Sequence, residues 1–175
     1  MNEEHERIES FERVYEEIFP VLFRVAYHIT GDRNTAEDLC QEAFIRYFNR
    51  TSPLKTMNDA KYWLIRVVKN LSFNYQKRKG REQSAYTKAY NEPQPELPDG
   101  EEELLREETS RLVREALEKL PQKLRSPIIL KEYGGLSYKE IGKILRITEG
   151  NVKVRVFRAR TQLQQFLNQE DVHVS

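Results

Sequence analysis

Lysine and arginine side chains gather in two separate blocks of the sequence, and each block could bind an anion. Residues 61–81 contain seven cations and no acid, and residues 143–160 contain six cations and one acid, Glu149. Residues 92–108, between the blocks, contain eight acids and one arginine. With its charges segregated in this way, a chain of net charge +1 can still carry two anion-binding faces. One charge run alone is more often a solvated helix face, but two basic blocks separated by an acidic one favour nucleic-acid binding.

The second basic block contains the segment NVKVRVFRAR (151–160), which fits two patterns. Its three valines alternate with two cations, which is typical of a half-buried strand. That alternation fails from Phe157 onward. Apolar residues at helical spacing instead continue for more than four turns, at Val152, Val156, Ala159, Leu163, Phe166 and Leu167. The segment is therefore predicted to be a helix.

The residues before this helix predict a helix-turn-helix. Ser137 and Glu140 form an S-x-x-E capping box, and Thr148 can cap a second helix after a tight turn. In this motif the early residues of the second helix face base edges, and flanking cations bind phosphate. The weaker alternative to DNA binding is a helical hairpin with a purely structural role, whose basic face is exposed to solvent. The candidate DNA contacts are Lys153, Arg155 and Arg158, with Arg160 on the flank and Gly150 and Asn151 letting the backbone approach phosphates.

The first basic block interleaves its cations with Tyr62, Trp63, Phe73 and Tyr75, a composition that suits stacking of exposed bases. Trp63 also lies on the apolar stripe of this helix, so a place in the core is its first expected role. The candidate DNA contacts off that stripe are polar or charged, and asparagine can read an adenine edge. They are Arg66, Lys69, Asn70 and Asn74, followed by Lys77 and Arg78 in the terminal basic cluster.

Catalysis and cofactor binding find no support in the sequence. The three histidines lack metal-ligand spacing, Cys40 falls on an apolar stripe, and no glycine-rich phosphate loop is present. We therefore expect no catalytic residues, no metal and no cofactor. No apolar run is long enough to span a membrane, and the acidic N-terminus is unlike a signal peptide, which predicts a cytoplasmic protein without membrane insertion.

The helices that position these blocks follow from apolar spacing and end signals. Pro20 should divide or kink the first helix, which Gly31 ends. Asn34 and Asp59 are the expected N-caps of the second and third helices, with a loop at 50–58 between them. Helix resumes near Glu101, and Ser126-Pro127 should begin a short helix that Gly134-Gly135 terminates.

The predicted fold class is all-α, with two small helical domains joined by a flexible acidic linker. The first domain comprises residues 1–81, the linker 82–108, the helix-turn-helix domain 109–170 and the tail 171–175. Three prolines and a glycine within 91–100 underlie the linker prediction.

Three segments resemble the extracytoplasmic-function (ECF) group of bacterial RNA polymerase sigma factors. AEDLCQEAFIRYF (36–48) resembles their region 2.2, YWLIRVVKNLSFNYQKRK (62–79) resembles regions 2.3 and 2.4, and residues 116–163 resemble region 4. The resemblance implies a dissociable sigma region 2 and region 4 subunit of RNA polymerase that directs promoter-specific transcription initiation. Its implied partners are core RNA polymerase, promoter DNA and an anti-sigma factor, which could hold it at the membrane.

The resemblance also implies residue roles. Asp38, Gln41 and Glu42, with Leu39 nearby, would dock on the clamp helices of the polymerase's largest subunit, and region 4 would meet the flap region. Arg66 and Asn70 would face the minus-ten element, with the loop at 50–58 holding a flipped base. The minus-thirty-five element would be read by Lys153, Arg155, Phe157 and Arg158.

Three residues depart from the family pattern. Arg146 occupies a turn position where the family often has glycine, so the turn either avoids positive φ or is strained. Val154 stands where a small polar residue is common, and Asn74 replaces a frequent aspartate. These departures affect which promoter sequence the protein is expected to recognise. They do not affect its resemblance to this group of proteins.

Two other readings explain part of the sequence. A stand-alone helix-turn-helix transcriptional regulator with a helical N-terminal domain would account for residues 137–160 but leaves 36–48 and the aromatic basic helix without a role. A helical scaffold or RNA-binding protein would bind with a salt dependence but little sequence discrimination. A sigma factor should enable core polymerase to transcribe from specific promoters. Neither of the two alternatives predicts this activity.

Overall fold

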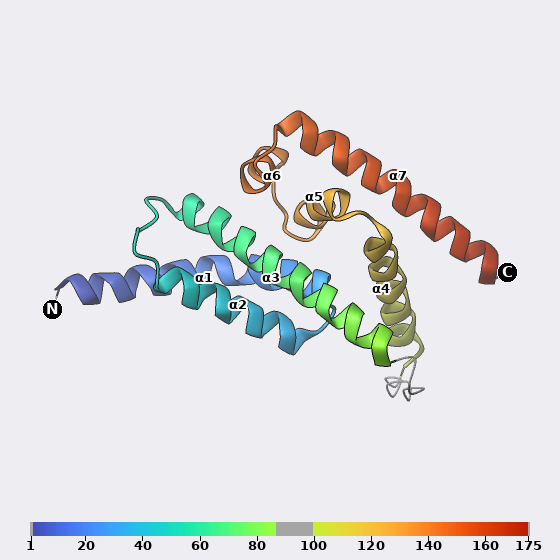
Figure 1. Ribbon diagram of the computed structural model, residues 1–175, viewed down its shortest axis with the longest axis horizontal. Coiled ribbons are helices and arrows are strands. Elements are labelled where there is room, and N and C mark those ends of the chain that lie inside the picture. The colour runs from blue at the N-terminus through green and yellow to red at the C-terminus, as the bar shows by residue number, and fades with distance from the viewer. Residues whose placement is uncertain (1, 87–99, 175) are drawn as a thin grey trace.

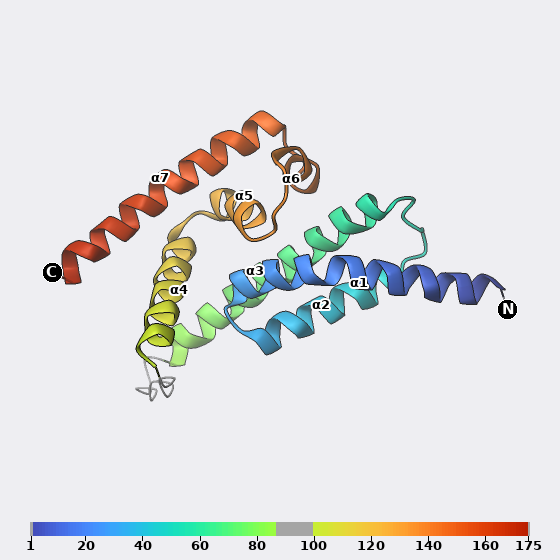
Figure 2. The same ribbon diagram turned by 180° about the vertical axis from the view of Figure 1, so that it is seen from behind.

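The computed structural model describes residues 2–86 and 100–174, and those residues are helical with no strand. This confirms the all-α prediction. The helices are α1 (Asn2–Thr30), α2 (Arg33–Phe48), α3 (Met57–Tyr86), α4 (Glu101–Lys119), α5 (Gln122–Glu132), α6 (Tyr138–Leu145) and α7 (Glu149–Val174). In Figures 1 and 2, α1, α2 and α3 form one bundle, α5 and α6 lie between that bundle and α7, and α4 lies near the end of α3.

The first bundle is built on α1, which runs unbroken through Pro20. A division of the helix there is therefore wrong. Pro20 lacks the N–H that would bond one turn back, but Ile18, Val21 and Leu22 around it are buried against the other helices, and this packing maintains the helix across the gap. The helix ends as predicted at Gly31, whose φ is 75°.

Three expected helix starts lie elsewhere. Asp32, not Asn34, caps α2, where its carboxylate accepts a hydrogen bond from the Thr35 amide at 3.2 Å. Thr56 caps α3 by accepting from the amide of Asp59 at 3.1 Å, which places Asp59 inside the first turn. The short helix α5 begins at Gln122 after Pro121, so the buried pair Ser126 and Pro127 lies within it.

Helices also occupy both ends of the predicted linker and most of the predicted tail. α3 continues to Tyr86, α4 begins at Glu101 as expected, and α7 reaches Val174. The prolines on which the linker prediction depended lie at 93–98, outside the described residues.

The two helical units pack against each other, and one apolar core cluster includes residues of both. At the end of α1, the His28 ring stacks on Tyr133 with centroids 3.5 Å apart, and Arg24 Nε donates to the Tyr133 carbonyl at 3.1 Å. Burial and the nearby Arg114 and Arg24 lower the pKa of His28 to about 4, so the stacked imidazole is neutral near pH 7. Further along, the Arg125 side chain donates to Gln76 at 2.9 Å.

Candidate nucleic-acid interface

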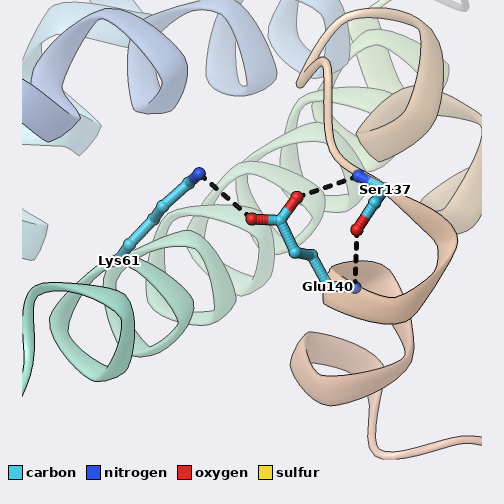
Figure 3. Close-up of polar contacts among 3 residues, drawn as sticks. All are labelled: Lys61, Ser137 and Glu140. Atoms are coloured by element: carbon cyan, nitrogen blue, oxygen red, sulfur yellow. Dashed lines mark hydrogen bonds and ion pairs between the residues drawn. The ribbon is translucent and has the colours of Figure 1, made fainter.

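The helix-turn-helix consists of α6, a tight turn and α7. The predicted capping box is confirmed (Figure 3): Ser137 Oγ accepts from the Glu140 amide at 3.1 Å, and Glu140 Oε2 accepts from the Ser137 amide at 2.9 Å. Thr148 caps α7 by accepting from the Asn151 amide at 3.2 Å, also as predicted. Arg146 adopts φ 57° and ψ 46°. The turn therefore does not avoid positive φ, and Arg146 has the strained left-handed conformation.

The turn packs closely over Gly142, a residue that the sequence analysis did not single out. A Cβ at this position would lie 2.8 Å from the backbone oxygen of Ile147. The Ile147 amide in turn donates to the Gly142 carbonyl at 3.0 Å. Glycine is therefore required here because the chain leaving α6 folds back across its own helix. A glycine inside an otherwise good helical pattern was the available signal.

The first turns of α7 confirm the helical interpretation of residues 151–160. Val152, Val156 and Ala159 are buried against the core, as the helical stripe requires. On the outward side the chain exposes a mixed basic and apolar surface, called here the α7 strip, which comprises Asn151, Lys153, Val154, Phe157 and Arg158. Gly150 is exposed beside it. This is the composition that reads base edges and phosphates in a major groove.

Two of the predicted cations lie outside the α7 strip. Arg155 is half-buried. Arg160 is bound to Glu132 of α5 through a hydrogen-bonded ion pair, which directs it back toward the protein. Lys153 remains exposed. It pairs with Glu149, one helical turn away, at 3.6 Å, and its Nζ lies 5.9 Å from the centroid of the Tyr138 ring. Such an exposed pair contributes little and can be exchanged for a phosphate.

The predicted contacts on α3 divide into two groups. Asn70, Asn74, Lys77 and Arg78 are exposed, whereas Trp63, Arg66 and Lys69 are half-buried. Burial lowers the pKa of Lys69, and the neighbouring Arg66 lowers it further. Arg66 donates from Nε to the Ile144 carbonyl at 2.9 Å and from a terminal nitrogen to the Lys143 carbonyl at 3.2 Å. It therefore contacts the end of α6.

A cleft of about 690 Å³ lies between the start of α3, the loop before it and the end of α6. The Arg50 guanidinium lies 4.7 Å from the centroid of the Trp63 ring, which lines this cleft. The volume falls in the range of small-ligand sites and exceeds what one nucleobase needs. Its walls come from both helical units: Leu54, Thr56, Asn58, Asp59, Tyr62, Trp63, Arg66, Lys143 and Arg146.

The predicted protein-docking residues of α2 are also divided. Asp38 and Gln41 are exposed, Glu42 is half-buried and bonded to Arg46 at 2.6 Å, and Leu39 is part of the core. Sequence reasoning missed Ile45, which follows Gln41 by one turn and is 61% exposed. Phe48, nearly one turn further along α2, is exposed as well. Exposed apolar side chains that form a patch mark protein-binding surfaces.

Other kinds of site are not apparent in the described part of the chain. Residues 2–86 and 100–174 contain no group of three histidine, cysteine or acidic residues able to hold a metal ion. Burial raises the pKa of the Cys40 thiol to about 12, which keeps it protonated and unreactive. None of the described helices is long and apolar enough to cross a membrane.

Comparison with known proteins identifies relatives of both helical units. The family described as Sigma-70 region 2 matches residues 14–82, and Sigma-70, region 4 matches residues 110–163. The chain is 31% identical to the ECF RNA polymerase sigma factor SigW of Bacillus subtilis over 154 residues, which cover 83% of this chain and 82% of SigW. It is 33% identical to SigE of Mycolicibacterium smegmatis over 147 residues, covering 83% of this chain but 57% of the length of SigE.

Two solved structures share the fold of this chain. The sigma factor RpoE, in complex with the anti-sigma factor NepR from Bartonella quintana, matches with a TM-score of 0.59 and 26% identity over 91% of this chain and 98% of that one. CnrH, in complex with the cytosolic domain of CnrY, shares the fold with a TM-score of 0.64 and 20% identity, covering 92% of this chain and 89% of that one. With both sigma regions in order and relatives above 30% identity, the chain belongs to the ECF RNA polymerase sigma factors.

Proposed function

We propose that this protein is an alternative sigma factor that binds core RNA polymerase and directs it to promoters with two recognition elements. The observation that carries the proposal is the α7 strip, an exposed basic and apolar surface at the start of the second helix of a helix-turn-helix. Within it Lys153 and Arg158 contact phosphates and guanine edges of the minus-thirty-five element. Phe157 and Val154 meet apolar base edges, and Gly150 and Asn151 approach the backbone.

The minus-ten element is assigned to α3 and the cleft at its start. Arg66, Asn70 and Asn74 face the bases, while Lys69, Lys77 and Arg78 supply positive charge along the strand. A base flipped from the opened duplex enters the cleft beside Trp63, where the loop at 50–58 forms one wall. Unstacking that base costs a few kcal/mol, which stacking on the indole and contacts with the cleft offset.

Two protein partners complete the proposal. The exposed face of α2, with Asp38, Gln41, Glu42 and Ile45, docks on the clamp helices of the largest polymerase subunit, and the helix-turn-helix domain meets the flap region. An anti-sigma factor restrains the protein, in keeping with the complex of the RpoE relative with NepR. The protein acts in the cytoplasm, and any attachment to the membrane is through that partner.

Run-off transcription with purified bacterial core polymerase and a library of genomic fragments tests this function. New transcripts that require the protein and share two spaced upstream elements are expected. Their absence, together with tight binding of the free protein to duplex DNA, would instead favour the stand-alone regulator. The control is the same reaction with core polymerase and DNA but without the protein.

The two apolar residues of the α7 strip predict that thymine methyl groups are part of the minus-thirty-five element. Val154 and Phe157 are 46% and 71% exposed and lie one helical turn apart. Replacing the thymine they contact with uracil, which lacks only the methyl, should weaken binding about fourfold, because burying one such group is worth about 0.8 kcal/mol.

This prediction is measured by competition titration of the holoenzyme with duplexes in which each thymine is replaced singly. Thymines outside the element provide the control. The Val154→Ser variant should lose part of the discrimination between thymine and uracil. Equal affinity for every duplex in the scan would show that the apolar pair does not read methyl groups.

A further inference from the structure

The first turns of α1 lie outside the part of the chain that matches Sigma-70 region 2. That match begins at residue 14, whereas α1 begins at Asn2, so the helix has about three turns before it, called here the α1 extension (residues 2–13). In Figures 1 and 2 these turns project past the end of α2. Neither the polymerase-docking residues nor the predicted DNA contacts lie in the α1 extension.

Two residues of the α1 extension hold Phe48, the last residue of α2. The Arg7 guanidinium donates to the Phe48 carbonyl at 2.8 Å and lies 4.7 Å from the centroid of the Phe48 ring. One turn further along α1, Phe11 packs edge-on against the same ring, with centroids 5.3 Å apart. The last carbonyls of a helix have no partner within it, so an arginine there both satisfies a carbonyl and complements the helix dipole. Arg7 therefore fixes the backbone and the side chain of the residue at which α2 ends.

The end of α2 leads directly into the loop that forms one wall of the cleft beside Trp63. Two residues after Phe48, the Arg50 amide donates to the Tyr47 carbonyl at 3.2 Å, and Arg50 Nε donates to the Ser52 carbonyl at 3.2 Å. The same guanidinium lies 4.7 Å from the centroid of the Trp63 ring. Arg50 thus connects the held end of α2 to both the loop and the cleft.

A second cleft, of about 830 Å³, lies between the α1 extension and this loop, and its lining includes Arg7, Phe48 and Arg50. The loop therefore faces open space on this side, and its conformation depends on how its first residues are held. A loop that is ordered in advance loses less conformational entropy when it closes on a base. A contact that fixes the start of the loop can consequently strengthen base capture without touching the base.

We propose that Arg7 is a positioning residue for promoter opening, because by holding Phe48 it orders the loop at 50–58 in advance for capture of the flipped base. The inference rests on the role proposed for that loop and adds a determinant from outside the matched sigma region. Arg7 contacts no DNA in this mechanism. Its loss therefore weakens DNA binding only where there is a base for the loop to capture.

Hydrogen exchange in the free protein gives a first readout that needs no DNA. Arg7→Ala removes both contacts to Phe48, and Arg13→Ala is the matched control, because Arg13 is exposed on the same helix and its loss changes the net charge equally. The hydrogen-bonded amides of Asn49 and Arg50 should exchange about fivefold faster in Arg7→Ala than in the control, as expected for loss of one exposed hydrogen bond and one cation–π contact. Equal exchange in the two variants would overturn the proposal.

Base capture is measured with the reconstituted holoenzyme and promoter duplexes that are premelted across the minus-ten element. An abasic site is placed at each position of the displaced strand in turn, and the position where it weakens binding of the unaltered protein most identifies the captured base. With that base present, Arg7→Ala should bind about fivefold more weakly than Arg13→Ala. With the abasic site in its place, the two variants should bind equally, because the coupling between Arg7 and the base is lost.

A merely structural role for Arg7 would weaken binding to both duplexes by the same factor, and that result would overturn the proposal. A different result tests the role of the loop itself. If the unaltered protein tolerates an abasic site at every position, the loop captures no base, and both its assignment and the positioning role of Arg7 are wrong.

Discussion

Replacing both Lys153 and Arg158 with alanine is expected to reduce promoter-specific transcription about a hundredfold. Both side chains are exposed on the α7 strip, where Lys153 forms an exposed ion pair with Glu149 and lies over the Tyr138 ring. Each well-placed contact to a guanine edge contributes about 1–3 kcal/mol, so the loss of two removes most discrimination between promoter and other DNA. The measurement is run-off transcription by the reconstituted holoenzyme from a promoter that the unaltered protein selects.

A second variant separates specific contacts from loss of charge. Arg106 and Arg111 are exposed on α4, and replacing both with alanine changes the net charge by the same amount. This control should retain nearly all transcription and show only a slightly altered salt dependence. Equal losses in the two double variants would mean that the α7 strip attracts DNA without reading it.

Replacing Gly142 with alanine is expected to destabilise the helix-turn-helix by about 2 kcal/mol, although alanine normally favours a helix. The new Cβ would lie 2.8 Å from the Ile147 carbonyl oxygen, so the turn between α6 and α7 would have to move. Denaturant unfolding followed by circular dichroism gives the free energy, and hydrogen exchange of α6 and α7 amides locates the change. Promoter affinity should fall as well, because the turn sets the orientation of α7.

Gly80 provides the matched comparison. It also lies within a helix, α3, but a Cβ there would have no neighbouring atom within 4 Å. Gly80→Ala should therefore stabilise the protein by up to about 1 kcal/mol. Opposite signs for the two substitutions are the expected result, and a gain in stability for Gly142→Ala would show that the turn tolerates a side chain.

Local signals predicted those features whose determinants are all close together in the chain. The capping box at Ser137 and Glu140 and the long apolar stripe of α7 are examples, since each pattern is complete within one element. The start of α2 was misplaced because Asp32 and Asn34 are both good caps, and only the backbone path after Gly31 decides between them. At α5, burial of Leu124 and Ile128 on either side of Pro127 outweighed the preference of proline for a first turn.

The pairing of α3 with α6 could not be predicted in this way. Arg66 was predicted to contact DNA because it lies on a basic, aromatic helix, but its observed partners, Lys143 and Ile144, are more than seventy positions away. Lys61 was counted in the basic block without a role, and its partner Glu140 was assigned only to a cap. A pattern shows which groups need a partner, whereas the tertiary fold determines which partner they find.

The cleft between α3 and α6 has one further consequence. Trp63, which lines it, is the only tryptophan in the sequence. Indole emission responds to nearby charge and to contact with water, and both change when a base stacks on the ring. The protein thus contains a native optical reporter at the position where its two helical units meet, one that can be followed without attaching a dye.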